Sequence, residues 1–122
     1  MIEVNNLTTN KVDKAFLRGV AKKVLEKKEF NLSIALVGQG RIKELNKRYR
    51  GKNKATDVLS FQYDNSGEVV ICLREVKKNA KQFKSTYKKE LTRVLIHGIL
   101  HILGYNHQTM RKKENCYLSQ VK

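Results

Sequence analysis

Hydrophobic residues recur along the first third of the chain at the spacings of a strand, a helix and a second strand. Residues 1–5 are predicted to form a short edge strand. Asn10, with Asp13 three residues later, predicts the N-terminus of a helix. The apolar residues that follow recur at i and i+4, as on the buried stripe of an amphipathic helix. They are Phe16, Leu17, Val20, Ala21, Val24 and Leu25.

The middle of the chain alternates between strand patterns and one short helix. Alternation over 32–37 predicts a strand that Gly38 and Gly40 end, with Leu32, Ile34 and Leu36 on one face. A helix over roughly 41–49 leads into a basic loop over 50–54. A second alternating strand is expected over 58–63, with Leu59, Phe61 and Tyr63 on one face. After a turn at 65–67, the uninterrupted apolar run 69–73 predicts a strand buried on both sides.

The remainder of the chain is predicted to be helical. One apolar stripe comprises Val76, Ala80, Phe83 and Tyr87. A second helix, about 89–103, is apolar almost all round and should lie in the core, with Gly104 suited to its C-cap. A last short helix is expected after Met110. This order predicts an α+β fold, in which a small mixed sheet of about four strands packs with four to five helices.

Length and composition indicate one domain over residues 1–122, since the chain has no proline, repeat or low-complexity linker. No stretch is long and apolar enough for a bilayer span, and no export signal precedes the first strand, so a cytoplasmic protein is expected. The two cysteines, Cys72 and Cys116, form no disulfide framework.

Lys and Arg total 26 against 11 acidic residues, a net charge of +15. This excess is typical of a protein with a polyanionic partner, although a lysine-rich genome produces the same composition.

The three histidines of the chain stand together as His97, His101 and His107. His97 and His101 are i and i+4 on the predicted core helix, so both imidazoles project from one face. Gly104 permits a turn that returns His107 toward the same point. Three histidines in an apolar segment need polar partners, and one shared Zn²⁺ ion satisfies all of them. Three protein ligands leave a fourth position for water, which is the pattern of a catalytic zinc site rather than a structural one.

The spacing HxxxHxxGxxH coincides with the metzincin protease signature, in which a Glu general base follows the first His. Gly98 stands at that position here, so peptide hydrolysis lacks its proton acceptor and Gly98 instead indicates close packing of the helix. Glu90, two turns before His97 on the same face, is either a partner for an imidazole N–H or an ordinary acid of the first helical turn.

The segment from His97 to His107 resembles the signature of the YbeY endoribonucleases, the bacterial rRNA maturation factors. A second block, Leu45-Asn46-x-x-Tyr49-Arg50 and then Thr56 to Phe61, resembles the central motif of that family. The resemblance covers most of the chain from the second strand onward. Two positions depart from the family pattern: Asn106 replaces an Asp, which leaves the contribution of that carboxylate open, and Gly67-Glu68 replaces Gly-Asp.

The resemblance implies a zinc-dependent, single-strand-specific endoribonuclease that acts in rRNA maturation and ribosome quality control. It implies zinc ligands at His97, His101 and His107 and an essential arginine at Arg50, with ribosomal RNA precursors, the ribosome or ribosomal proteins as partners. Arg50 could clamp a phosphate bidentately as charge builds up. The roles of Asp57, Ser60 and Glu68 stay open, as does the nucleophile. The alternative is a non-catalytic zinc-containing module that docks on rRNA, which a fourth protein ligand such as Glu114 or Cys116 would favour.

Overall fold

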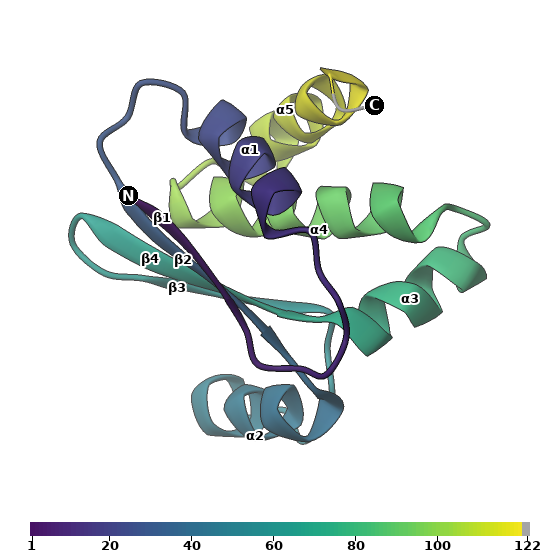
Figure 1. Ribbon diagram of the computed structural model, residues 1–122. Coiled ribbons are helices and arrows are strands. Elements are labelled where there is room, and N and C mark those ends of the chain that lie inside the picture. The colour runs from purple at the N-terminus through teal and green to yellow at the C-terminus, as the bar shows by residue number, and fades with distance from the viewer. Residues whose placement is uncertain (121–122) are drawn as a thin grey trace.

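The structure of the protein, a computed structural model, describes residues 1–120, apart from the side chains of His107 and Gln120. The predicted α+β architecture is confirmed, with a four-stranded mixed sheet and five helices in the described part of the chain (Figure 1). In chain order the elements are β1 (Ile2–Asn6), α1 (Lys14–Leu25), β2 (Asn31–Val37), α2 (Gln39–Arg50), β3 (Val58–Gln62), β4 (Ser66–Cys72), α3 (Leu73–Gln82), α4 (Tyr87–Ile102) and α5 (His107–Gln120).

The sheet has the strand order β1-β2-β4-β3. Strands β1, β2 and β4 run parallel, and β3 pairs with β4 in the antiparallel direction. The register sets Ile34 beside Val69 on β4, and Val69 beside Ser60 on β3. Because β3 lies at the edge, one side of its backbone has no neighbouring strand, and the candidate site forms along this open edge.

Helices cover both faces of the sheet, so the central strands are buried on both sides (Figure 1). The alternation of β2 sends Leu32, Ile34 and Leu36 into a large core with α1 and α4. Ala35 and Val37 point the opposite way, into a smaller core under α2. The uninterrupted apolar run of β4 divides in the same manner, which confirms the predicted burial on both sides.

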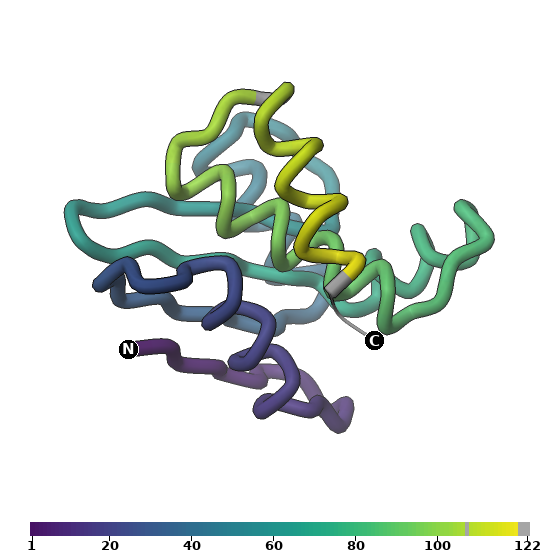
Figure 2. Tube along the Cα trace, turned by 90° about the horizontal axis from the view of Figure 1, so that it is seen from above, coloured from purple at the N-terminus to yellow at the C-terminus, as the bar shows by residue number. Residues whose placement is uncertain are grey.

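Helix α4 crosses the large core, as its apolar composition predicts, and its residues Leu95, Ile96 and Ile99 are fully buried. Gly104, with φ of +85°, follows the helix in the left-handed region that favours glycine. The chain then reverses, and α5 runs back over α4 (Figure 2). This reversal brings the C-terminal helix onto the side of α4 that carries the histidines.

Several boundaries differ from the predictions; the strand predicted over 69–73, for example, is β4 at Ser66–Cys72. Asp13, not Asn10, is the N-cap of α1, where its carboxylate accepts a hydrogen bond from the Phe16 amide at 3.0 Å. Gly40 lies inside α2, since Gly38 alone supplies the extended N-cap. The predicted stripe with Phe83 and Tyr87 spans two helices: α3 ends at Gln82 and leaves Phe83 exposed, while Tyr87 begins α4. Helix α5 begins at His107, before the predicted start after Met110.

Candidate metal and RNA site

His97 and His101 lie one turn apart on α4, with ring centroids 6.5 Å apart. Both side chains line the same open cavity of about 390 Å³ at the edge of β3. The i, i+4 spacing therefore places two imidazoles side by side, as predicted, and leaves both accessible from the cavity.

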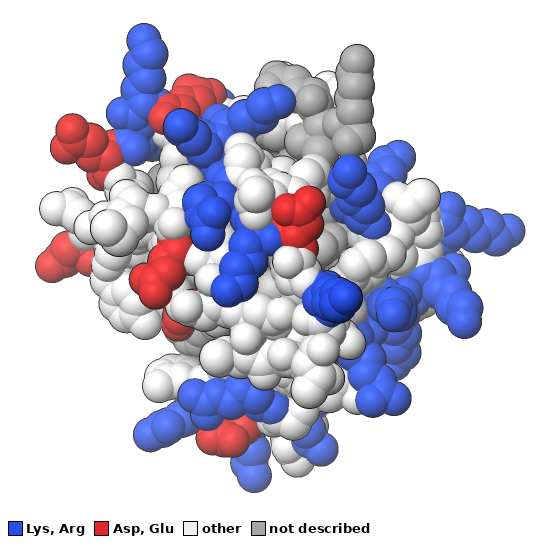
Figure 3. Space-filling view, in the orientation of Figure 1, with Lys and Arg blue, Asp and Glu red and all other residues white. Residues whose placement is uncertain are grey.

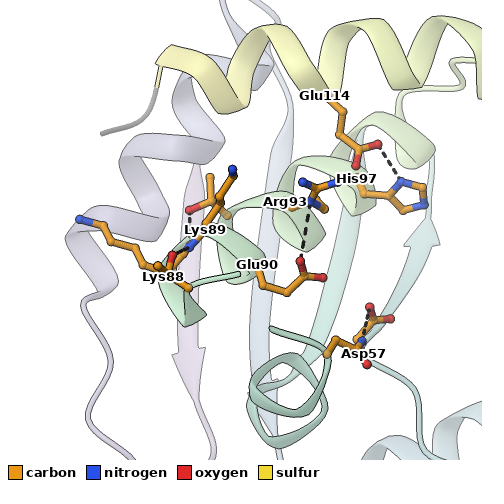
Figure 4. Close-up of polar contacts among 10 residues, drawn as sticks. Asp57, Lys88, Lys89, Glu90, Arg93, His97 and Glu114 are labelled. Carbon is orange, nitrogen blue, oxygen red and sulfur yellow. Dashed lines mark hydrogen bonds and ion pairs between the residues drawn. The ribbon is translucent and has the colours of Figure 1, made fainter. Parts of the chain in front are cut away.

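A carboxylate on α5 fixes the orientation of one of these imidazoles. Oε2 of Glu114 lies 3.0 Å from Nδ1 of His97 (Figure 4). The Glu114 side chain is only 17% exposed. This hydrogen bond, opposed by burial of the ring, raises the pKa of His97 above its usual value. With Nδ1 engaged by Glu114, Nε2 is the nitrogen left to bind a metal.

Glu90, the acid considered as a partner for a histidine, interacts elsewhere. Its carboxylate lies 3.7 Å from the guanidinium of Arg93, one turn along α4 (Figure 4). The side chain is buried, and this burial raises its pKa. The acid that contacts the imidazole of His97 is therefore Glu114, which lies 17 residues beyond it in sequence.

The third predicted ligand, His107, is the first residue of α5, and its side chain lies outside the described residues. Its neighbour Asn106 caps this helix. The Asn106 Oδ1 accepts a hydrogen bond from the Thr109 amide at 2.8 Å, which satisfies one of the amides at the helix N-terminus. Asn106 thus keeps an acceptor at the position where the resembling family has Asp.

Arg50 reaches the same cavity from the other side of the sheet. It is the last residue of α2, since the helix continues one residue beyond its predicted end and Gly51 closes it with φ of +69°. The guanidinium donates to the Ser60 carbonyl at the open edge of β3, at 3.3 Å. Arg50, His97 and His101 therefore share one cavity although they come from opposite faces of the sheet.

The basic loop after α2 is held against this cavity by Asn46. The buried side-chain amide of Asn46 donates to the Lys54 carbonyl at 2.9 Å. The backbone carbonyl of Asn46 accepts from the backbone amide of Lys52 at 3.3 Å. Lys52 and Lys54 both line the cavity with Arg50. The loop thus adds cations to the cavity that the two histidines line, which suits a phosphate-bearing ligand.

Gly98 explains how α4 approaches the sheet so closely. A Cβ at this position would lie 2.9 Å from Cγ1 of Val69 and 3.2 Å from Oγ of Ser60. The Ser60 hydroxyl donates to the Gly98 carbonyl at 3.1 Å and ties β3 to the helix. The predicted close packing is confirmed, and the position that carries the general base in metzincins has no room for a Glu side chain here.

Asp57 lies beside the site without lining its cavity. Its carboxylate accepts a hydrogen bond from the side-chain amide of Asn79 at 3.3 Å, and its backbone carbonyl accepts one from the backbone amide of Cys72 at 2.9 Å. Asp57 therefore joins the start of β3 to α3. These contacts are structural, and they are the contacts of a residue whose role the sequence leaves open.

Basic side chains dominate much of the surface. In Figure 3 they gather over α2 and around α3 and the turn after it, with fewer acidic side chains between them. In residues 1–120, no helix combines the length and the hydrophobicity that a bilayer crossing requires. The distribution extends the positive charge well beyond the cavity itself.

Comparisons with known proteins point to one family. The profile of the family described as Endoribonuclease YbeY matches residues 2–121. A protein named Endoribonuclease YbeY from Sulfurihydrogenibium sp. is 40% identical over 112 residues, which cover 83% of this chain and 74% of the relative. A relative of the same name from Thermodesulfovibrio yellowstonii is 44% identical over 106 residues, covering 75% and 67% of the two chains.

The fold has a solved counterpart in a solution structure of a Thermotoga maritima protein. The two structures superpose with a TM-score of 0.73 at 32% sequence identity, over 99% of this chain and 89% of the other. The similarity therefore extends over the whole arrangement of strands and helices that builds the site.

Proposed function

Because the chain belongs to the YbeY family of endoribonucleases, and so is a hydrolase that cuts RNA internally, we propose that it uses one zinc ion to cleave single-stranded regions of ribosomal RNA precursors. The proposed zinc ligands are His97, His101 and His107, and Arg50 is the proposed essential arginine. The observation that carries the proposal is the cavity that Arg50 shares with His97 and His101.

The described donor set fits a zinc ion. Two neutral imidazoles one turn apart are common zinc ligands, and the Glu114 carboxylate on Nδ1 of His97 resembles the partner that metal-bound histidines usually have. Zinc, when bound, supplies Lewis acidity and a water of lowered pKa. No residue of the chain then has to serve as the general base that Gly98 cannot provide.

Arg50 is placed to hold the phosphate. Its planar guanidinium can form two parallel hydrogen bonds to phosphate oxygens, and the contact with the Ser60 carbonyl limits its range of positions. Because negative charge accumulates on those oxygens as the nucleophile attacks, Arg50 stabilises the transition state more than the ground state. Lys52 and Lys54 attract the neighbouring phosphates.

The positive charge of the chain favours partners that carry phosphates. A net charge of +15 favours long contacts with an RNA backbone through neutralisation of phosphates. We therefore propose rRNA precursors as substrate, the ribosome or its proteins as docking partners, a role in ribosome quality control, and a cytoplasmic location. The docking-module alternative, in which a fourth protein ligand closes the metal shell, is not favoured, because neither Glu114 nor Cys116 lines the cavity of the two histidines.

The test is cleavage of an end-labelled single-stranded RNA by untagged protein, with a duplex of the same sequence and a chelator as controls. Arg50→Ala and His101→Ala are prepared identically, and Arg18→Ala on α1 serves as a charge-matched control. We expect Arg50→Ala to lower the cleavage rate by about a hundredfold or more, and Arg18→Ala to leave it close to that of the parent.

Two measurements guard against a contaminating RNase. Cleavage must follow the protein through the final column, and the zinc content per chain must fall in His101→Ala. If Arg50→Ala and His101→Ala cut RNA as fast as the parent, the proposed site is wrong. A plain 3′-hydroxyl at the product end would exclude attack by the ribose 2′-hydroxyl.

A further inference from the structure

A second, larger cavity lies on the α2 side of the sheet and adjoins the proposed catalytic cavity. It encloses about 630 Å³, and its walls include Tyr49, Phe61, Tyr63 and Glu68. We propose that it is a nucleobase subsite, in which the aromatic rings stack on an unpaired base of the RNA and Glu68 accepts hydrogen bonds from the amino group of that base. This inference rests on the proposed function and names the part of the substrate that the site recognises.

The aromatic wall follows from the two-residue period of β3. Leu59 and Phe61 point to the α2 side, and Tyr63, directly after the end of β3, lines the same cavity. The exposure of these residues rises from 5% at Leu59 to 57% at Tyr63. Helix α2 therefore covers the beginning of β3 and leaves its end open. The Tyr49 ring, also 57% exposed, meets Phe61 edge to face at 5.3 Å. Exposed rings held in this manner are the usual platform for single-stranded bases.

Glu68 supplies a carboxylate to the wall of the cavity. It lies opposite Phe61 in the register of β3 and β4, so both side chains point to the same face of the sheet. The carboxylate is half-buried on a central strand and has no hydrogen-bond or ion-pair partner in the described part of the chain. Arg41 lines the same cavity, but it pairs with Glu44 at 3.1 Å. A ligand that donates hydrogen bonds would satisfy this carboxylate.

The hydrogen-bond donors of the four bases predict how well each base binds the Glu68 carboxylate. Guanine presents N1–H and an N2 amino group side by side, which matches the two oxygens of a carboxylate. Cytosine and adenine each offer one amino group, and uracil offers a single N–H between two carbonyl oxygens that a carboxylate repels. Glu68 is therefore expected to favour guanine most and uracil least.

The two cavities are placed to bind one continuous strand. Ser60 lines both of them, and Tyr49 directly precedes Arg50 on α2. A phosphate held by Arg50 can thus belong to a nucleotide adjacent to the stacked base. A base within a duplex has its Watson–Crick edge occupied and cannot enter, so the subsite also accounts for selection of single strands.

The test uses fluorescein-labelled RNA hexamers, UUUUUU and UUGUUU, and fluorescence anisotropy with the zinc-loaded protein and, because that form is proposed to cut RNA, also with the chelator-treated protein. A denaturing gel confirms that the RNA is intact after each titration. Tyr63→Ala removes the exposed ring, and Tyr63→Phe retains it. Phe83→Ala removes a similarly exposed ring outside the cavity. Glu68→Gln is compared with Glu3→Gln, which removes the same charge from β1.

We expect the parent to bind UUGUUU about tenfold more tightly than UUUUUU. Tyr63→Ala should weaken binding of both hexamers by about tenfold, while Tyr63→Phe and Phe83→Ala stay near the parent. Glu68→Gln should lose the preference for guanine, and Glu3→Gln should keep it. Thermal unfolding of each variant checks that the fold is retained.

The subsite is overturned if the parent shows no preference between the hexamers, if Tyr63→Ala binds as the parent does, or if Phe83→Ala weakens binding equally. These results are separable from the proposed function. A parent that shows the expected binding pattern but leaves RNA uncut contradicts the zinc-dependent cleavage and supports the subsite. A parent that cuts RNA, with binding unaffected by Tyr63→Ala and Glu68→Gln, contradicts the subsite alone.

Discussion

Nδ1 of His97 on α4 and Oε2 of Glu114 on α5 lie 3.0 Å apart, and the side chain of Glu114 is largely buried. The pair connects the central helix of the core to the last helix of the chain. Since the carboxylate holds one ring nitrogen, it orients the other toward the position proposed for zinc.

Replacing Glu114 with Gln should therefore weaken zinc binding by about 10- to 100-fold, because the ring of His97 loses its charged partner. Competition with a chromophoric chelator measures the affinity directly and does not depend on RNA cleavage. Glu29→Gln removes the same charge from an exposed site and should leave the affinity unchanged. Equal zinc affinity in Glu114→Gln and the parent would show that the pair has no role in metal binding.

The same pair predicts how the metal-free protein responds to pH. The pKa of His97 is raised chiefly by its hydrogen bond to Glu114, so the folded state binds a proton at His97 more tightly than the unfolded state does. This contribution to stability is complete below the unfolded pKa of about 6.5 and is lost as the pH rises through the folded pKa.

Nuclear magnetic resonance of the imidazoles can follow this titration, since the chain has only three histidines. The resonance of His97 in chelator-treated protein should titrate above pH 6.5, and Glu114→Gln should bring its midpoint down. The gain in unfolding free energy of the parent over Glu114→Gln should shrink as the pH rises above about 6.5. A midpoint that Glu114→Gln leaves in place would contradict the prediction.

Local patterns in the sequence sufficed for most of the fold and for the placement of His97 and His101 beside each other on α4. The i, i+4 spacing of His97 and His101 is a property of one helix, and the alternation of β2 reports its two buried faces. Where the prediction was wrong, competing local signals were present: Asn10 and Asp13 are both good helix caps, and only the structure shows that Asp13 caps α1.

Contacts between distant elements were beyond such patterns. Glu114 meets His97 only because the chain reverses at Gly104 and lays α5 over α4, and no periodicity encodes the rotation of α5 about its axis. Glu90 satisfied every local criterion for that role, yet Arg93 is its partner. Arg50 was singled out through the family resemblance, since its residue type and loop context alone fit any solvated arginine.

Gly98→Ala should destabilise the protein by about 1–2 kcal/mol, because overpacking against Val69 outweighs the higher helix propensity of Ala. The new Cβ would lie 2.9 Å from a methyl group of a fully buried β-branched side chain, which has little freedom to move. Gly19→Ala on α1 is the matched control. Nothing lies within 4 Å of its Cβ, so it should stabilise the fold by about 0.5–1 kcal/mol.

Urea unfolding of the chelator-treated proteins compares the two alanine variants without a contribution from bound metal. The Gly98 variant should also lose RNA cleavage, since Ser60, which bonds to the Gly98 carbonyl, carries the carbonyl that holds Arg50. If Gly98→Ala stabilises the protein as much as Gly19→Ala does, α4 has space against the sheet and the packing argument fails.

Asn106 offers a test of what its position requires, because its Oδ1 caps α5 through the Thr109 amide. Asn106→Asp retains this oxygen and adds a negative charge at a helix N-terminus, so we expect the unfolding free energy to be unchanged or about 0.3–1 kcal/mol higher. Asn106→Ala removes the cap and should cost about 0.5–2 kcal/mol. Thermal unfolding of the chelator-treated variants measures both effects. Should Asn106→Asp lower stability as much as Asn106→Ala, the amide group rather than the capping oxygen is what this turn requires, and the role assigned to Asn106 is wrong.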